Sequence, residues 1–162
     1  MSKRFRYWSS PIGSLLLAGE ERLQIVGFAT GSKARRADAD WVEDRRAFAD
    51  VAEQLGEYFA GERQGFDLDL DLRGTPFQLD VWRALREIPY GDTVSYGDIA
   101  RQIDRSKAVR AVGTANGSNP IPVIVPCHRV IGASGKLTGF GGGLEAKSYL
   151  LNLESPALQL MG

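Results

Sequence analysis

The sequence has very few of the residues that cross-link a chain or hold a metal ion. Its 162 residues include one cysteine, Cys127, and one histidine, His128. A single cysteine excludes a disulfide within the chain, and this pair is too small a donor set for a structural zinc site, so we predict no metal. A lone cysteine is more often a small buried hydrophobe than a reactive group. Its function must therefore be argued from its neighbours.

Long apolar runs and an excess of one charge are also missing. No apolar run approaches the length that crosses a bilayer, and no apolar signal region follows the basic N-terminus. We expect a soluble, cytoplasmic protein (cytosolic or nuclear in a compartmented cell) without a membrane partner. Basic and acidic residues balance at 20 each, but residues 101–136 hold six basic residues against one acidic residue. That stretch is consistent with a phosphate-facing surface, although most charge runs are simply solvated.

The sequence pattern changes near Gly74, and we predict two lobes, residues 1–74 and 75–162. In the first lobe, three short segments have the composition of strands, at 5–9, 15–18 and 23–29. Residues 41–59 have helical periodicity, and residues 66–72 alternate apolar and acidic side chains, which is typical of a half-buried strand. The first lobe is therefore predicted to be a small α/β unit.

The second lobe is predicted to be mainly helical. Thr75 followed by Pro76 is a typical helix start, and apolar residues then recur on one face as far as Ile88. Leucines with helical spacing predict a last helix over residues 144–154. Packing of the α/β lobe on this helical lobe would give an α+β fold.

The middle of the second lobe has the outline of a helix-turn-helix. Ser95 and Asp98 form a capping box that opens a short helix. A break at residues 104–106 separates it from another short helix at 108–116, which is basic. Two short helices around a tight turn are typical of DNA-binding proteins, although many helical hairpins bind nothing.

The segment before Cys127 is rich in proline. Prolines at 120, 122 and 126 forbid a helix there and favour a stiff, extended path that would hold the thiol in place. A free thiol has a pKa of ~8.5, so a reactive cysteine needs a base, and the only histidine is the next residue. Adjacent side chains on an extended strand point to opposite faces. We therefore expect His128 to reach the thiol through a water, or through a bend after Pro126.

An imidazole that accepts a proton needs a carboxylate to orient it and to stabilise its cation. The residues alone leave two candidates in the last predicted helix, Glu154 and Glu145. A Cys-His pair taken by itself is more often chance adjacency than a catalytic pair.

Longer motifs resemble one known family, the O6-alkylguanine-DNA alkyltransferases (methylated-DNA–protein-cysteine methyltransferases). The matching blocks are Ser95-Tyr96-Gly97, Arg110-Ala111-Val112-Gly113, Asn119-Pro120, Pro126-Cys127-His128-Arg129-Val130, Gly142-Gly143-Leu144, Lys147, Leu150-Leu151 and Glu154. The resemblance covers the chain from about Phe77 to Glu154, whereas the N-terminal third resembles the family only loosely. Because separated blocks occur in the family's order, the resemblance is specific.

The resemblance implies DNA repair by a protein that acts once. An alkyl group would pass from the O6 atom of guanine, or from the O4 atom of thymine, in double-stranded DNA to Cys127, which keeps it. The damaged nucleotide would first be turned out of the stack, at a cost of a few kcal/mol. No cofactor would be needed, and the protein would act as a monomer.

The resemblance also implies roles for individual residues. Cys127 would be the acceptor, His128 the base acting through a water, and Glu154 the group that orients His128. Asn119 would brace the active-site turn. Lys147 would lie near Cys127, although taken by itself it is better interpreted as a surface lysine.

Further implied roles concern the DNA and the guanine. Arg110 would replace the extruded base in the stack, and the Tyr96 phenol would face the flipped guanine. The backbone carbonyls of Cys127 and Val130 would accept from the guanine amino group. Some family members have tyrosine where this chain has Phe140, which can cover the guanine but cannot donate to it. Hydrogen bonds from the glycine-rich lid would then come from backbone N–H groups around Gly141 and Gly142.

Three other classes of protein remain open at this point. Alkyltransferase-like proteins share the frame but lack the cysteine, so Cys127 argues against a pure binder. A cysteine peptidase or another thiol hydrolase would turn over and ignore DNA, which the helix-turn-helix pattern and the basic stretch oppose. A transcription factor would use the helix-turn-helix alone and would bind undamaged DNA of defined sequence.

Overall fold

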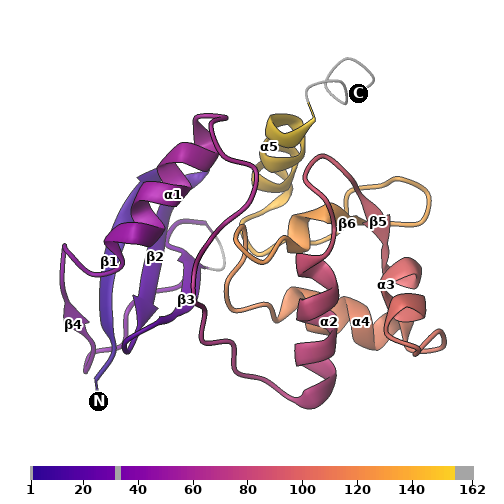
Figure 1. Cartoon of the computed structure of the whole chain (residues 1–162), viewed down its shortest axis with the longest axis horizontal. Coiled ribbons are helices and arrows are strands. Elements are labelled where there is room, and N and C mark those ends of the chain that lie inside the picture. The colour runs from indigo at the N-terminus through magenta and orange to yellow at the C-terminus, as the bar shows by residue number, and fades with distance from the viewer. Residues whose placement is uncertain (1, 32–33, 156–162) are drawn as a thin grey trace. The chain divides into compact units, whose positions relative to one another are not determined.

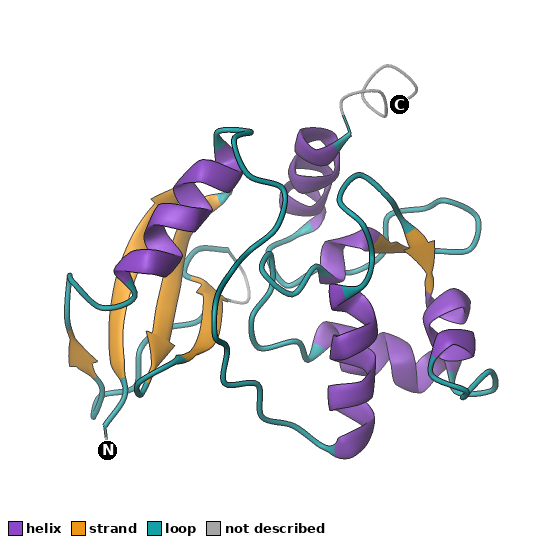
Figure 2. Cartoon of the chain, viewed as in Figure 1, coloured by secondary structure: helices purple, strands orange, loops and turns teal. Residues whose placement is uncertain are grey.

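The computed structural model describes residues 2–31 and 34–155. The chain divides into two compact units, Met1–Leu72 and Arg73–Gly162. Within the described residues, no helix has the length and apolar character needed to cross a membrane. The first unit is built around a sheet and the second is mainly helical, in agreement with the predicted α+β fold (Figure 2).

The first unit is a four-stranded sheet with one helix across it (Figure 1). Its elements are β1 (Arg4–Ser10), β2 (Gly13–Gly19), β3 (Leu23–Phe28), β4 (Val42–Glu43) and α1 (Ala49–Phe59). The strand order is β3-β2-β1-β4, in which β1, β2 and β3 are antiparallel and β4 is parallel to β1. The three strands predicted from composition are therefore confirmed.

Both faces of β2 are covered. Leu16 and Ala18 cluster with Phe5 on one face. Leu15 points to the other face because side chains alternate along a strand. Its cross-strand partner Trp8 lies on that same face and stacks on Phe59 of α1, with ring centroids 5.9 Å apart. The helix therefore covers the Leu15 face of the sheet.

Two predictions for the first unit are wrong. The helix predicted over residues 41–59 begins only at Ala49, because Val42–Glu43 pairs with β1 instead. Residues 66–70 show the predicted alternation of burial, but residues 66–72 form only one isolated bridge, between Leu70 and Leu23. In both places contacts distant in sequence override the local pattern.

The second unit is mainly helical, as predicted. Its elements are α2 (Pro76–Arg86), β5 (Val94–Ser95), α3 (Tyr96–Gln102), α4 (Val109–Gly117), the 3₁₀ turn η1 (Cys127–Arg129), β6 (Val130–Ile131) and α5 (Leu144–Glu154). Both predicted helix starts are present: Thr75 forms a capping box with Gln78, and Ser95 forms one with Asp98. The last predicted helix, α5, has the predicted bounds.

The helices α2, α3 and α4 form the framework for the cysteine. Trp82 of α2 is buried, and its indole N–H donates to the Ala115 carbonyl of α4 at 2.9 Å. The break between α3 and α4 spans residues 103–108, longer than predicted, and contains Asp104 with a φ of 58°. The two helices form the predicted helix-turn-helix.

A short parallel pairing was not predicted. Val94 pairs with Val130, and Ser95 pairs with Ile131. Because each strand has two residues, neither carries a recognisable period in the sequence. The pairing fastens the start of α3 to the residues that directly follow η1.

Candidate active site

Cys127 lies at a bend. The backbone turns at Pro126 (φ −81°, ψ 64°), and Cys127–Arg129 form one turn of 3₁₀ helix. The Cys127 N–H donates to the Val125 carbonyl at 2.8 Å across the bend at Pro126, and the Arg129 N–H donates to the Pro126 carbonyl at 3.0 Å within the 3₁₀ turn. The predicted extended path is therefore wrong at these three residues, where the chain takes the alternative bend. It is also wrong at residues 121–125, where the Val125 N–H donates to the Ile121 carbonyl at 2.9 Å across a tight turn. The cysteine is 5% exposed.

Asn119 fastens the turn that precedes the cysteine. Its amide Nδ2 donates to the Val125 carbonyl at 2.8 Å, and its Oδ1 accepts from the Ile121 N–H at 3.0 Å. Within this turn Val123 is buried with a φ of 75°. A β-branched residue in the left-handed region is strained, so surrounding contacts must hold it there. The Asn119 side chain supplies two of them.

His128 and Glu154 form a buried pair. His128 Nε2 lies 2.8 Å from Glu154 Oε2, and the two side chains are 0% and 1% exposed. Burial lowers the pKa of His128, and the hydrogen bond and charge of Glu154 oppose that shift. Among the described residues, His128 Nδ1 has no hydrogen-bond partner. The other candidate, Glu145, is exposed in the first turn of α5.

The cysteine itself is held as a thiol. Burial raises the pKa of Cys127 to about 11, against smaller lowering effects of the Asn119 side chain and the Lys147 charge. With that pKa, about one molecule in ten thousand would carry a thiolate at pH 7. A proton acceptor is therefore needed for nucleophilic chemistry at neutral pH.

Lys147 is fully buried, so its interpretation as a surface lysine is wrong. Its ammonium donates to the Val130 carbonyl at 2.7 Å and to the Thr138 carbonyl at 3.0 Å. Burial lowers the pKa of Lys147, and the nearby Cys127 raises it. The Val130 carbonyl thus already has a donor, but a carbonyl oxygen has two lone pairs and can accept another.

The loop before α5 contacts both His128 and Tyr96. The Tyr96 hydroxyl hydrogen-bonds with the Thr138 hydroxyl. Phe140 is half-buried and lies edge-on to His128, with ring centroids 6.5 Å apart. Gly141 is exposed and Gly142 is half-buried. Of the predicted lid residues, Phe140 therefore lies beside the imidazole, whereas the phenol is contacted by Thr138 of the same loop.

Arg110 is exposed on α4, next to Val109, which is 41% exposed. The basic stretch is smaller than its sequence count. Arg129 is buried, and Arg101 forms an ion pair with Asp98, just outside the stretch. The remaining exposed basic residues are Arg105, Lys107, Arg110 and Lys136.

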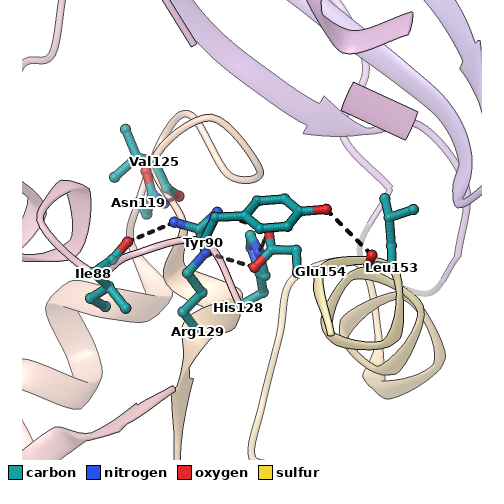
Figure 3. A network of polar contacts seen from close by, with 8 residues as sticks. All are labelled: Ile88, Tyr90, Asn119, Val125, His128, Arg129, Leu153 and Glu154. Carbon is teal, nitrogen blue, oxygen red and sulfur yellow. Dashed lines mark hydrogen bonds and ion pairs between the residues drawn. The ribbon is translucent and has the colours of Figure 1, made fainter. Parts of the chain in front are cut away.

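Sequence reasoning missed two residues of the site. Arg129, counted there only as a surface charge, donates from Nε and Nη2 to the Glu154 carboxylate at 2.7 and 2.9 Å (Figure 3). Asn116 of α4 is buried and donates weakly to the Cys127 carbonyl at 3.5 Å. Membership of the Pro-Cys-His-Arg motif was the available signal for Arg129; Asn116 had none.

The site offers the chemistry of an activated thiol. Within residues 2–31 and 34–155, no group of three or more histidine, cysteine, aspartate or glutamate side chains could hold a metal ion. A thiol next in sequence to a buried imidazole–carboxylate pair is suited to nucleophilic attack, with the imidazole as base.

Comparisons with known proteins cover both units. Residues 3–72 match the ribonuclease-like domain, and residues 76–156 the DNA-binding domain, of 6-O-methylguanine DNA methyltransferases. The chain is 56% identical over 156 residues to a methylated-DNA–protein-cysteine methyltransferase of Mycolicibacterium paratuberculosis, covering 94% of each chain. A Methanosarcina acetivorans relative with the same name is 54% identical over 151 residues, covering 93% of this chain and 97% of its own.

A solved structure agrees with these matches. The Mycobacterium tuberculosis protein named OGT, crystallised in complex with DNA, has a TM-score of 0.88 and 51% sequence identity, and the match covers 98% of this chain and 99% of that one. Both domain models match in order, and together they span most of the chain. The chain therefore belongs to the 6-O-methylguanine DNA methyltransferase family.

Proposed function

We propose that this protein repairs DNA by taking the alkyl group of O6-alkylguanine onto Cys127, as a methylated-DNA–protein-cysteine methyltransferase. The observation that carries the proposal is the buried hydrogen bond between His128 and Glu154 directly after the cysteine. It supplies the base that a thiol with a raised pKa requires. The family membership supplies the substrate class.

The reaction is a single in-line displacement. The Cys127 S–H proton passes through a water to His128 Nδ1, and Glu154 stabilises the resulting imidazolium. The sulfur forms a bond to the alkyl carbon while the bond from that carbon to guanine O6 breaks. The departing guanine takes a proton from the Tyr96 phenol, and the resulting phenolate regains a proton from water, while His128 releases its proton to water. The product is a thioether that water does not hydrolyse, so each molecule acts once.

Double-stranded DNA is the expected partner, and the Mycobacterium tuberculosis relative was crystallised in complex with DNA. The exposed face of α4, which carries Arg110, would lie against the duplex, and the damaged nucleotide would turn out of the stack toward Cys127. The lid residues Phe140, Gly141 and Gly142 would cover the base. We expect a monomer in the cytosol, where a free thiol stays reduced.

The test is the mass of the intact protein after incubation with duplex DNA containing O6-methylguanine. We expect a gain of one methyl group on the peptide that contains Cys127, and no further gain with excess substrate. Repeated turnover would contradict the single-use mechanism and favour a hydrolase. DNA binding without any mass gain would indicate a non-catalytic binder or a transcription factor.

Arg110 gives a separate prediction about base flipping. A guanidinium can stack in the gap left by a flipped nucleotide, whereas an ordinary surface arginine would only contact phosphate. We expect Arg110→Ala to slow repair of duplex DNA far more than reaction with free O6-benzylguanine, which needs no flipping. Arg110→Lys should repair duplex DNA little faster than Arg110→Ala, because an ammonium keeps the charge but has no planar group that can stack.

The control for Arg110 is Lys107→Ala, which removes an exposed charge from the preceding turn. It should weaken DNA binding and reduce the slope of log affinity against log salt concentration by about one. The repair rate at saturating DNA should change little. If Arg110→Lys repairs duplex DNA as fast as the parent, Arg110 belongs to the basic surface only.

A further inference from the structure

Arg129 is held from three sides behind the His128–Glu154 pair (Figure 3). Its Nε and Nη2 donate to the two carboxylate oxygens of Glu154, and its Nη1 donates to the Ile88 carbonyl at 2.7 Å. Its guanidinium carbon lies 5.7 Å from the centre of the Tyr90 ring. With its side chain 8% exposed, Arg129 contributes little charge to the surface.

The first consequence concerns the charge of Glu154. Its side chain is 1% exposed, and a carboxylate so far from water tends to bind a proton unless a positive charge faces it. The guanidinium fork places an opposite charge against both carboxylate oxygens. Glu154 therefore stays ionised, and its plane is fixed by the paired hydrogen bonds.

The second consequence concerns the hydrogen on His128. An ionised carboxylate only accepts, so Nε2 of His128 must carry the hydrogen and Nδ1 keeps a lone pair. A protonated Glu154 could instead donate to Nε2, and the ring hydrogen would then move to Nδ1. That tautomer cannot take a proton from the thiol, because its Nδ1 is already occupied.

We propose that Arg129 is a positioning residue for alkyl transfer, which holds Glu154 ionised and so selects the His128 tautomer that can accept the thiol proton. This inference rests on the function proposed above. The Ile88 carbonyl and the Tyr90 ring in turn orient the guanidinium of Arg129.

An opposing effect has to be weighed. The Arg129 cation disfavours a second positive charge on His128. The carboxylate oxygen, however, touches His128 Nε2 directly at 2.8 Å, and its charge acts at shorter range than that of the guanidinium. Loss of the ionised carboxylate should therefore outweigh relief of the repulsion, and removing Arg129 should slow transfer.

The test is the single-turnover rate of methyl transfer against pH for Arg129→Met, which keeps much of the volume but no charge. We expect a loss of about tenfold or more at neutral pH, of the order seen when a general base is impaired, shrinking as the pH rises. Arg129→Met combined with Glu154→Gln should lose little more than Glu154→Gln alone, because both changes disable one relay. Additive losses, or a parent-like pH profile in Arg129→Met, would overturn the proposal.

Leu85→Ala is the control for stability, since Leu85 is buried in α2 and has no part in the relay. It should lower the melting temperature without changing the shape of the pH profile. Arg129→Lys keeps the positive charge but not the paired hydrogen bonds to Glu154. Its transfer rate at neutral pH should lie between those of the parent and Arg129→Met. If Arg129→Met does not fold, Arg129→Gln, which is also neutral but polar, carries the test, and a parent-like rate and pH profile in that variant would overturn the proposal. Absence of transfer by the parent would instead refute the proposed function.

Discussion

Replacing Cys127 by serine is expected to abolish methyl transfer while leaving DNA binding intact. The serine hydroxyl is far less acidic and less nucleophilic than a thiol, so the loss should be on the order of 10⁴-fold or more, as for other catalytic nucleophiles. The two side chains are close in size, and Cys127 is buried in a turn held by backbone bonds that do not involve its sulfur. Intact mass and DNA affinity at fixed salt measure the two effects.

Retained transfer in Cys127→Ser would place the acceptor elsewhere. A large loss of DNA affinity would mean that the sulfur supports the binding surface itself. The parent protein at the same salt concentration is the necessary reference, because phosphate contacts make affinity strongly dependent on salt.

Replacing Glu154 by alanine is expected to cost both activity and stability. The carboxylate accepts from His128 and twice from Arg129, all within the core. Removing it leaves the guanidinium buried without a counter-charge, which should lower the free energy of unfolding by about 3–5 kcal/mol. Transfer at neutral pH should fall by about a hundredfold or more, and a higher pH should be needed for the same rate. His128→Ala should show the same pH shift.

Glu145→Ala is the matched control, since Glu145 is the other candidate carboxylate of α5 but is exposed. It should leave the rate unchanged and alter stability by at most a few tenths of a kcal/mol. Denaturant unfolding measures the stability, and single-turnover assays across a range of pH measure the relay. If Glu154→Ala keeps the parent's rate at neutral pH, the relay is wrong.

The sequence predicted the parts of the fold that local signals determine. Thr75 with Gln78 and Ser95 with Asp98 start helices because each pair satisfies free N–H groups within four residues. The helix α5 likewise follows from its own leucine spacing. In contrast, Val42–Glu43 is a strand because it pairs with the edge of β1. The local sequence around Val42 gives no sign of that pairing.

The site divides in the same way. The residues alone left Glu154 and Glu145 open as partners of His128, and the resemblance to the family selected Glu154. The structure places the side chains of His128 and Glu154 2.8 Å apart. The contact between Arg129 and Glu154 joins residues 25 positions apart, and periodicity cannot say which charges meet across such a distance. The burial of Lys147 was not predicted because lysine is nearly always exposed. It could be predicted only by knowing which carbonyls accept hydrogen bonds from its ammonium.

The proline-rich segment has a consequence for how the site comes apart. Ten consecutive residues, 121–130, are buried, although only a 3₁₀ turn and the first residue of β6 lie among them. Buried backbone N–H groups need hydrogen-bond acceptors, and Pro122 and Pro126 have no backbone N–H that would require one. Other amides are anchored, as Ile121 is on the Asn119 side chain. Residues 121–130 are therefore part of the core of the second unit. They should open only when the whole unit unfolds, so that each molecule is either folded and able to accept an alkyl group or unfolded.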